Sequence, residues 1–346
     1  RELWQTMNDW VYEGFNRTYQ RQGAKFEKVY LESDTYAQGR DIVFDHLAQG
    51  RLCRDATGNI VIDLTDQGLG QKVLVRADGT TVYITQDIGT AVQRFKEFAP
   101  LGQLVYVVAN EQRYHFQVLF KMLEQFGYPW AGKCFHRAYG MVNLPTGKMS
   151  SRKLKQGGVF LADELMDQLH ELAKAAIAER DKELSGAELE ERAEIIGLAA
   201  LKYWLLRTNP DNDVTFLPEE SLRFDGNSGP YLLYCIARIH SLLQKAGEIT
   251  PGNLSLLASP EELALTKALA AFPETVESAA TGYNPSLVAN LLYEIASSFS
   301  RWYGACPILG SENQALRNAR LQLAQATAIV LESGLKLLGI ESLRQM

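Results

Sequence analysis

The spacing of apolar residues changes once along the chain. Up to about residue 160, short apolar runs alternate with helical patterns, as in an α/β domain, and beyond it the pattern is almost wholly helical. Residues 28–31 and 104–109 are rich in β-branched and aromatic residues and too short for helices, so they predict buried strands. A helical pattern over 111–126 follows the second strand. This order predicts a doubly wound unit, in which ligands lie beyond the carboxyl ends of the strands.

The other segments predict ribbons, an initial helix and a bundle. Residues 52–84 alternate and turn repeatedly, which predicts antiparallel ribbons inserted in or attached to the parallel sheet. Helical spacing of Leu3, Met7, Trp10, Val11 and Phe15 predicts an amphipathic helix at the start. The later helices, punctuated by prolines, are expected at 161–180, 187–206, 229–247, 260–280, 285–304 and 312–338. We place the domain boundary near residue 222, which gives 1–222 and 223–346.

Composition narrows the class of protein. The 346 residues can bury the cores of two domains, and no apolar run is long enough to cross a bilayer. The first residues lack the apolar core of a signal peptide, so we expect a cytoplasmic protein without membrane contact. The four cysteines form no CxxC pair, which predicts neither structural zinc nor disulfides. The formal net charge of −6 argues against a purely electrostatic binder of nucleic acid.

One window is locally basic. Residues 125–162 contain no acidic residue but include Lys133, Arg137, Lys148, Arg152, Lys153 and Lys155, so an anion is the expected partner. Within it, Gly-Lys-Met-Ser-Ser-Arg at 147–152 offers a hinge, two cations and two hydroxyls, which suit the charge on leaving pyrophosphate. Lys148, Ser150, Ser151 and Arg152 are therefore candidate catalytic residues. The alternative is a solvated loop.

The run at 147–152 resembles the KMSKS-type signature of class I aminoacyl-tRNA synthetases, and it stands after α/β segments and before a helical bundle, as in that family. Segments 82–89, 108–116 and 223–231 resemble arginyl-tRNA synthetases in particular, and the resemblance extends from about residue 25 to the end. It implies the C-terminal part of a Rossmann-like class I catalytic domain, followed by an all-α anticodon-binding domain. The segment after Arg152 is longer than the family's usual Lys-Gly step, which leaves the reach of the loop toward ATP open.

By this resemblance, Tyr83, Asp87 and Gln112 line a pocket for L-arginine. A carboxylate suits that ligand because it can hold a guanidinium through two parallel charge-assisted bonds. Gln86 stands where the family has an arginine, whereas the tyrosine and the aspartate remain. Asp87 has an alternative interpretation, as a first-turn residue of a helix starting after Thr85, where the helix dipole would stabilise its charge.

The resemblance also implies an ATP site that includes His115, Gly140, Met141, Val142 and Lys148. The histidine equally fits a packed helix residue, and the Gly-Met-Val segment equally fits an ordinary core strand. Mg²⁺ accompanying ATP would share the charge of pyrophosphate. The implied reaction is attack of the arginine carboxylate on the α-phosphate of ATP, followed by transfer of arginine to the terminal ribose of tRNA(Arg).

In the helical domain the resemblance implies contacts with the anticodon. Unstacked bases need aromatic faces and guanidinium planes. We select Tyr231, Arg238, Trp302, Tyr303 and the terminal Met346 as tRNA-binding residues, with Tyr234 and Phe299 nearby on the same helices. Helically spaced aromatics also fit a core, and this alternative holds for most of them. Tyr303 is the best candidate for stacking because Cys306-Pro307 predicts a helix end beside it.

Class I synthetases also carry a His-x-Gly-His signature, and the five histidines here are isolated. We therefore interpret the chain as part of a longer, monomeric enzyme, and expect charging activity from the complete protein and none from this chain. The alternative is a fragment that acts only as a tRNA-binding module. A cysteinyl enzyme is set aside, since it would need cysteine and histidine zinc ligands that the sequence does not offer.

Overall fold

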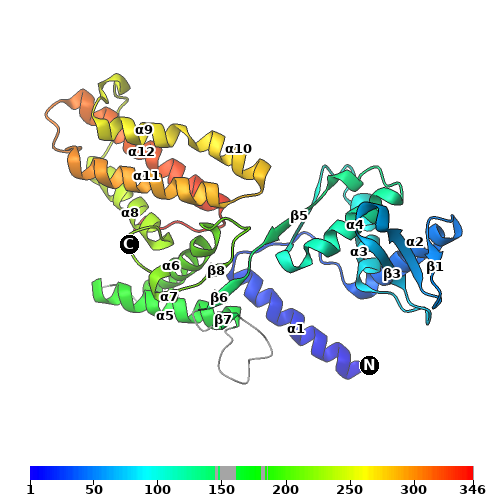
Figure 1. Cartoon of the computed structure of the whole chain (residues 1–346). Coiled ribbons are helices and arrows are strands. Elements are labelled where there is room, and N and C mark those ends of the chain that lie inside the picture. The colour runs from blue at the N-terminus through cyan, green and yellow to red at the C-terminus, as the bar shows by residue number, and fades with distance from the viewer. Residues whose placement is uncertain (145–146, 149–160, 181–183, 185, 346) are drawn as a thin grey trace. The chain divides into compact units, whose positions relative to one another are not determined.

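The computed structural model describes residues 1–144, 147–148, 161–180, 184 and 186–345 (Figure 1). It contains two compact units, Lys25–Gly140 and a second that joins Arg1–Ala24 to Met141–Met346. In the described part of the chain, no helix is both long and apolar enough to pass through a membrane.

The first unit contains the strand, helix and strand predicted around residue 104. Strand β4 (Leu104–Ala109) leads through a short 3₁₀ turn, η2 (Asn110–Gln112), into helix α4 (Arg113–Gln125). Strand β5 (Cys134–Tyr139) then pairs parallel with β4 along its whole length. The predicted order is confirmed, because α4 buries its apolar face, including Phe116, Leu119 and Leu123. Ligand-binding positions are therefore expected beyond the ends of these strands.

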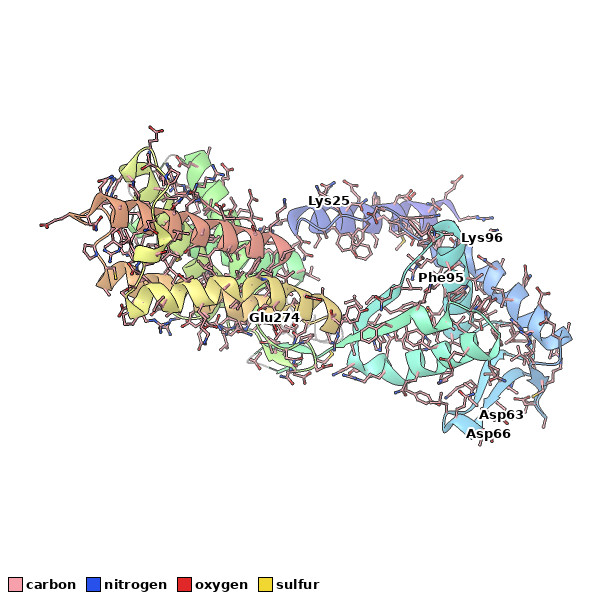
Figure 2. All side chains as sticks on the ribbon, turned by 90° about the horizontal axis from the view of Figure 1, so that it is seen from above. Lys25, Asp63, Asp66, Phe95, Lys96 and Glu274 are labelled. Carbon is pink, nitrogen blue, oxygen red and sulfur yellow. The ribbon has the colours of Figure 1, made fainter. Side chains whose placement is uncertain are left out.

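An antiparallel sheet accompanies this unit. Strands β1 (Cys53–Arg54), β2 (Ile60–Leu64) and β3 (Gly70–Val75) pair in that order, as the turns in the sequence predict. They form a sheet of their own, and most of the β2 side chains are buried. Figure 2 shows Asp63 and Asp66 together at this ribbon. Asp63 accepts hydrogen bonds from the backbone and hydroxyl of Thr65, which lower the pKa of its carboxyl.

Two expectations about buried strands are wrong. Residues 28–31 form no strand: Val29 is 70% exposed, while Lys28 and Tyr30 each place a polar group 2.5 Å from Glu97 Oε2. A four-residue apolar run becomes a strand only where another strand satisfies its backbone groups, and none pairs with it in the described chain. Strand β4 does exist, but its Val107 is 66% exposed rather than buried.

Helix α2 (Glu32–Ala48) crosses helix α3 (Tyr83–Glu97) at a pair of glycines. A Cβ atom added at Gly39 would lie 2.0 Å from the carbonyl oxygen of Thr85, and one at Gly89 would lie 2.7 Å from the Gly39 nitrogen. Thr85 is itself fixed, because its hydroxyl donates to the Leu74 carbonyl at 2.7 Å. The two glycines therefore set how closely α3 approaches α2.

Replacing Gly39 by alanine should destabilise the protein by about 2 kcal/mol, since the added methyl forces α2 and α3 apart. Urea unfolding of the two proteins measures the difference. Gly14→Ala is the matched control, because Gly14 also lies inside a helix, but a Cβ atom added there would meet no described atom within 4 Å. We expect Gly14→Ala to be neutral or to stabilise by up to about 1 kcal/mol. Equal effects at both positions would refute the role of the crossing.

The second unit begins with helix α1 (Glu2–Arg21), which confirms the predicted N-terminal helix. Its apolar residues are exposed in this structure, Leu3 and Trp10 by 70% and 65%. The end of the helix is held by charge: Arg21 Nε lies 2.7 Å from Glu194 Oε1, and Arg21 Nη1 lies 2.5 Å from Asp167 Oδ1. The two carboxylates belong to helices α6 (Gly186–Leu206) and α5 (Ala162–Arg180), respectively.

The strands of a small mixed sheet flank helices α5 and α6 in the sequence, with β6 (Val142–Leu144) and β7 (Gly147–Lys148) before them and β8 (Val214–Thr215) after them. Strand β6 pairs antiparallel with β7 and parallel with β8. A compact cluster packs beside it, made of Leu165, Met166, Leu169, Leu201, Trp204 and Phe216. Helix α7 (Pro218–Ser221) follows β8. The predicted domain boundary near residue 222 falls just after α7 and stays a prediction.

The rest of the unit is a helical bundle (Figure 1). It consists of α8 (Gly229–Ala246), α9 (Pro260–Ala270), α10 (Phe272–Gly282), α11 (Ser286–Ala305) and α12 (Gln314–Leu337). The single helix predicted at 260–280 is wrong: the chain breaks at Ala271 and restarts as α10 with Pro273 in its first turn. Proline has no N–H to continue the backbone hydrogen bonds of α9, whereas its fixed φ suits the first turn of a new helix.

Candidate functional site

Two residues predicted to bind different substrates are joined by a hydrogen bond. Asp87 lies in the second turn of α3, and His115 lies in the first turn of α4, just beyond the end of β4. His115 Nε2 is 2.6 Å from Asp87 Oδ2, and both side chains are partly exposed. The bond fixes the orientation of the carboxylate. It leaves Oδ1 as the oxygen that His115 does not contact.

The alternative interpretation of Asp87 is wrong. Helix α3 begins at Tyr83, three residues earlier than expected, and its first turn contains no acidic residue. Asp87 therefore lies beyond the reach of the unpaired N–H groups at the helix start. The partner of its carboxylate is the imidazole of His115 rather than the helix end.

His115 is partly packed and partly accessible. Its ring meets Phe116 edge-on, with centroids 5.4 Å apart, and its side chain is 27% exposed. His115 and Tyr83 also line one shallow hollow of about 250 Å³, together with Lys72, Tyr114 and Val118. Tyr83 itself is 77% exposed. The structure thus brings Tyr83, Asp87 and His115 together.

Gln112 stands apart from this hollow. It is exposed at the residue that precedes α4, three positions before His115. The expected role of Gln112 at arginine stays a prediction.

Two residues near this site were missed by sequence reasoning. Tyr106, on β4, is 9% exposed and packs on Phe116; burial raises the pKa of its phenol, and the charge of Asp87 adds to that effect. His136, on β5, donates from its Nε2 to the Val108 carbonyl oxygen at 2.9 Å, and burial lowers the pKa of its imidazole. Only the parallel pairing of β4 with β5 places both beside Phe116.

The segment expected to back adenine leads into strand β6, which begins at Val142. Gly140 is buried, and the Met141 N–H donates to Asp213 Oδ1 at 2.7 Å. The Met141 carbonyl accepts from the Val214 N–H at 2.8 Å, and Val142 packs on the cluster around Phe216. These contacts support the core-strand interpretation, and contact with ATP stays a prediction.

The structure reaches only the start of the predicted phosphate loop. Lys148 ends β7, where its backbone pairs with Asn143 of β6. Ser150, Ser151 and Arg152 lie outside the described residues, so their catalytic roles stay predictions.

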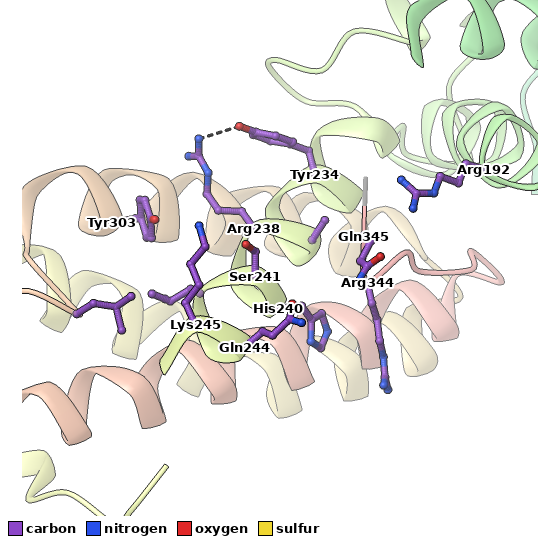
Figure 3. Close-up of a pocket in the computed structure, with 13 residues that line it drawn as sticks. Arg192, Tyr234, Arg238, His240, Ser241, Gln244, Lys245, Tyr303, Arg344 and Gln345 are labelled. Atoms are coloured by element: carbon purple, nitrogen blue, oxygen red, sulfur yellow. Dashed lines mark hydrogen bonds between the residues drawn. The ribbon is translucent and has the colours of Figure 1, made fainter. Parts of the chain in front are cut away.

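A larger hollow, of about 830 Å³, lies on the helical bundle (Figure 3). Arg238 is its central cation: its Nη2 donates to the Tyr234 hydroxyl at 2.7 Å, and its guanidinium lies 5.3 Å from the centre of the Tyr303 ring. The charged residues that line the hollow are Arg192, Arg238, Lys245 and Arg344, and no carboxylate is among the lining residues that the structure describes. Such a surface suits unstacked bases and phosphates.

The predicted tRNA-binding residues divide into four groups. Arg238 and Tyr303 line the hollow, and Tyr303 is 38% exposed. Trp302 is completely buried in the bundle core, so its assignment as an RNA contact is wrong. Tyr231 is half-buried against the same core, and its hydroxyl oxygen lies 2.9 Å from Ser300 Oγ. Met346 lies outside the described residues.

Of the cations that line this hollow, only Arg238 was predicted from the sequence. Arg192 comes from α6, and Arg344 comes from the segment after α12. Neither stands near Tyr303 in the sequence, so no local pattern links them. Their approach depends on how α6 and the C-terminal segment fold against α8.

Comparison with known proteins defines the class. The family model of tRNA synthetases class I (R), catalytic domain, matches residues 1–217, and that of the DALR anticodon binding domain matches 232–346. The chain is thus a class I catalytic domain followed by a helical anticodon-binding domain. Within class I, it belongs to the arginyl-tRNA synthetase family, since the catalytic model covers more than half of the chain.

Individual relatives agree. The chain is 46% identical to the arginine–tRNA ligase of Treponema pallidum over all of its own length and 59% of that protein, and 42% identical to that of Flavobacterium psychrophilum over 98% and 56%. The solved Thermus thermophilus arginyl-tRNA synthetase superposes with a TM-score of 0.83 at 28% identity, over 95% of this chain and 62% of that one. The chain therefore spans a little under three fifths of the curated relatives it matches.

Proposed function

We propose that the protein is an arginine–tRNA ligase, which activates L-arginine with ATP and transfers it to tRNA(Arg). The proposal rests on one observation above all: in a chain of this family, an oriented aspartate lies beside an exposed tyrosine just beyond the end of β4. A carboxylate and an aromatic face are the groups that recognise a guanidinium.

Each residue of this group has a distinct proposed role. Asp87 holds the guanidinium of arginine, and its bond to His115 keeps the carboxylate from rotating. Tyr83 offers an exposed ring on which the planar guanidinium can stack. Gln112 offers an amide near the start of α4, and His115 is proposed to contact the nucleotide. The site thus selects arginine by charge and by shape.

The proposed chemistry needs no covalent enzyme intermediate. An oxygen of the arginine carboxylate forms a bond to the α-phosphorus of ATP, while the bond from that phosphorus to the bridging oxygen breaks and pyrophosphate leaves. A ribose hydroxyl of tRNA then attacks the arginyl carbonyl, and AMP leaves. Lys148 to Arg152 supply charge and hydroxyls for the pyrophosphate, and Gly140 to Val142 back the adenine.

Mg²⁺ is proposed to arrive with ATP. In the described chain, no group of three His, Cys, Asp or Glu residues is placed to hold a metal ion. Mg²⁺ in nucleotide sites commonly binds substrate phosphates and waters with few protein ligands. Bound in that way, it neutralises charge on the pyrophosphate.

The helical hollow is proposed to receive the anticodon of tRNA(Arg). Tyr303 and Tyr234 provide exposed aromatic rings, and the planar guanidinium of Arg238 lies close to both. We further propose that the ligase acts as a monomer in the cytoplasm.

Two measurements test the proposed function. A ligase of the relatives' full length that carries this chain should charge tRNA(Arg) with arginine, and should exchange pyrophosphate into ATP only when arginine is present. This chain alone should bind tRNA(Arg) in a mobility-shift assay. Lysine or cysteine charged in place of arginine would refute the substrate, and failure of the chain to bind tRNA(Arg) would refute the assigned anticodon surface.

Replacing Tyr303 by alanine should weaken tRNA(Arg) binding about tenfold, because one base loses its stacking partner. Fluorescence anisotropy with a labelled tRNA measures the affinity. Tyr12→Ala is the matched control, since Tyr12 is 41% exposed on α1 and does not line the hollow. Equal losses in both variants, or none in Tyr303→Ala, would show that the base does not stack there.

A further inference from the structure

Neighbouring residues at the end of α6 belong to two different cores. Tyr203 is completely buried in the core of the helical bundle, whereas Trp204 packs in the small cluster beside the β6 and β8 strands. Val142 of β6 and Val214 of β8 pack on that same small cluster. The last turn of α6 is therefore where the bundle and the strand sheet are joined.

Arg207, just after α6, links the two sides through polar contacts. Its guanidinium lies 3.7 Å from the centre of the Trp204 ring, and it donates a hydrogen bond to the carbonyl oxygen of Asn227, which precedes α8. Its own carbonyl accepts from Asn290 Nδ2 of α11 at 3.1 Å. Arg207 thus contacts Trp204 of α6, the segment that leads into α8, and helix α11.

The contact continues from Trp204 into the strands. The indole N–H of Trp204 donates to the Thr215 carbonyl of β8 at 3.1 Å. Strand β8 pairs with β6, and β6 pairs with β7, where Asn143 lies opposite Lys148. Lys148 is the cation of the proposed phosphate loop that the structure describes, at the end of β7.

The bundle side of this joint is stiff. The Tyr203 hydroxyl oxygen lies 2.5 Å from Asn227 Oδ1 and 2.9 Å from the carbonyl oxygen of Ala289. A Cβ atom at Gly229 would lie 2.3 Å from the Ala199 carbonyl oxygen, so α8 touches α6 backbone to backbone. Closely packed elements pass on a displacement rather than absorbing it.

We propose that Arg207 is a positioning residue that couples tRNA binding on the helical bundle to the conformational order of strands β6 and β8. Through these strands, the coupling reaches the backbone at Lys148. This inference rests on the proposed function. The tRNA would contact α8, which carries Arg238. Arg207 binds both the segment that leads into α8 and the side chain of Trp204, and so connects the two. Trp204 then fixes β8 through Thr215.

Hydrogen exchange of this chain, with and without tRNA(Arg), tests the coupling. The reporting amides are those of Val214 and Phe216, which donate to the carbonyls of Met141 and Asn143 at 2.8 Å. We expect tRNA to slow their exchange by about fivefold, at the lower end of usual coupling between sites. Arg207→Met keeps most of the apolar stem, and should abolish the slowing while tRNA affinity measured by anisotropy stays unchanged.

Two further variants separate coupling from damage to the fold. Arg223→Met removes an exposed guanidinium, paired with Asp225 at 2.9 Å in the same segment, and should leave the slowing intact. Arg207→Lys restores a cation and should restore part of the effect. If tRNA binds but the amides do not respond, or respond equally in Arg207→Met, the coupling is refuted. If tRNA does not bind, the failure is that of the proposed function.

Discussion

Asp87→Asn is expected to raise the KM for arginine strongly in a ligase of the relatives' full length that carries this chain. The amide keeps the shape of the side chain but loses the charge that faces the guanidinium. Removing one partner of a desolvated charge pair costs at least about 2 kcal/mol, or about thirtyfold in binding, and the low end applies because Asp87 is 38% exposed. Arginine-dependent pyrophosphate exchange measures KM, and the KM for ATP should stay within about twofold, since charge loss at Asp87 acts on arginine.

Asp66→Asn is the matched control for charge. Asp66 lies in the short 3₁₀ turn between β2 and β3, at the ribbon in Figure 2, and is exposed. It carries the same charge as Asp87 in the same unit but lines no part of the hollow beside His115. An unchanged arginine KM in Asp87→Asn, or an equal rise in both variants, would show that another residue recognises the guanidinium.

Arg320→Met is expected to destabilise the helical bundle by about 3 kcal/mol or more, because it leaves a buried carboxylate without its partner. Arg320 Nε lies 2.7 Å from Glu262 Oε1, and the Glu262 side chain is only 1% exposed. Its other oxygen accepts from the backbone of Ala258 and Ser259 at 2.9 Å. Thermal unfolding should show a fall of about 10 °C. Arg301→Met, on the exposed face of α11, should change stability by less than about 0.5 kcal/mol.

The pH dependence of this pair is a second test. Burial opposes ionisation of Glu262, but the bonds from Ser259 and Arg320 outweigh it and hold the pKa below its ordinary value of 4.5. A carboxyl with a lowered folded-state pKa stabilises the fold above its unfolded pKa and loses that contribution as pH falls through the folded value. The difference in stability between the protein and Glu262→Gln should therefore shrink below pH 4.5. A difference that stays constant through this range would refute the ionised pair.

The fold was predictable where one segment carries its own signal. Residues 104–126 contain a strand and a helix with clear periodicity, and both are present. Residues 28–31 have the composition of a strand, but composition does not supply a pairing neighbour. The helix predicted at 260–280 failed for a local reason, because Pro273 breaks a hydrophobic pattern that continues across it.

The candidate site was predictable only in part. Resemblance selected Asp87 and His115 for different substrates, and only the packing of α3 against α4 shows that they touch. Trp302 and Tyr303 are neighbours with similar chemistry, yet one is in the core and the other in the hollow. Helical spacing separates their directions by about 100° and cannot say which direction faces solvent. Gly39 and Gly89 likewise gave no signal, since their role depends on a crossing between distant helices.

The absence of carboxylates among the described residues that line the bundle hollow has a consequence for how RNA arrives. The chain has 35 basic and 41 acidic residues, so apart from the four cations of the hollow, 31 basic residues stand against 41 acidic ones. A polyanion is repelled by the average surface and attracted by this hollow, so the electric field can orient tRNA before any contact forms. Capture should therefore be fastest in dilute salt and slow steeply as salt is added, while dissociation changes less.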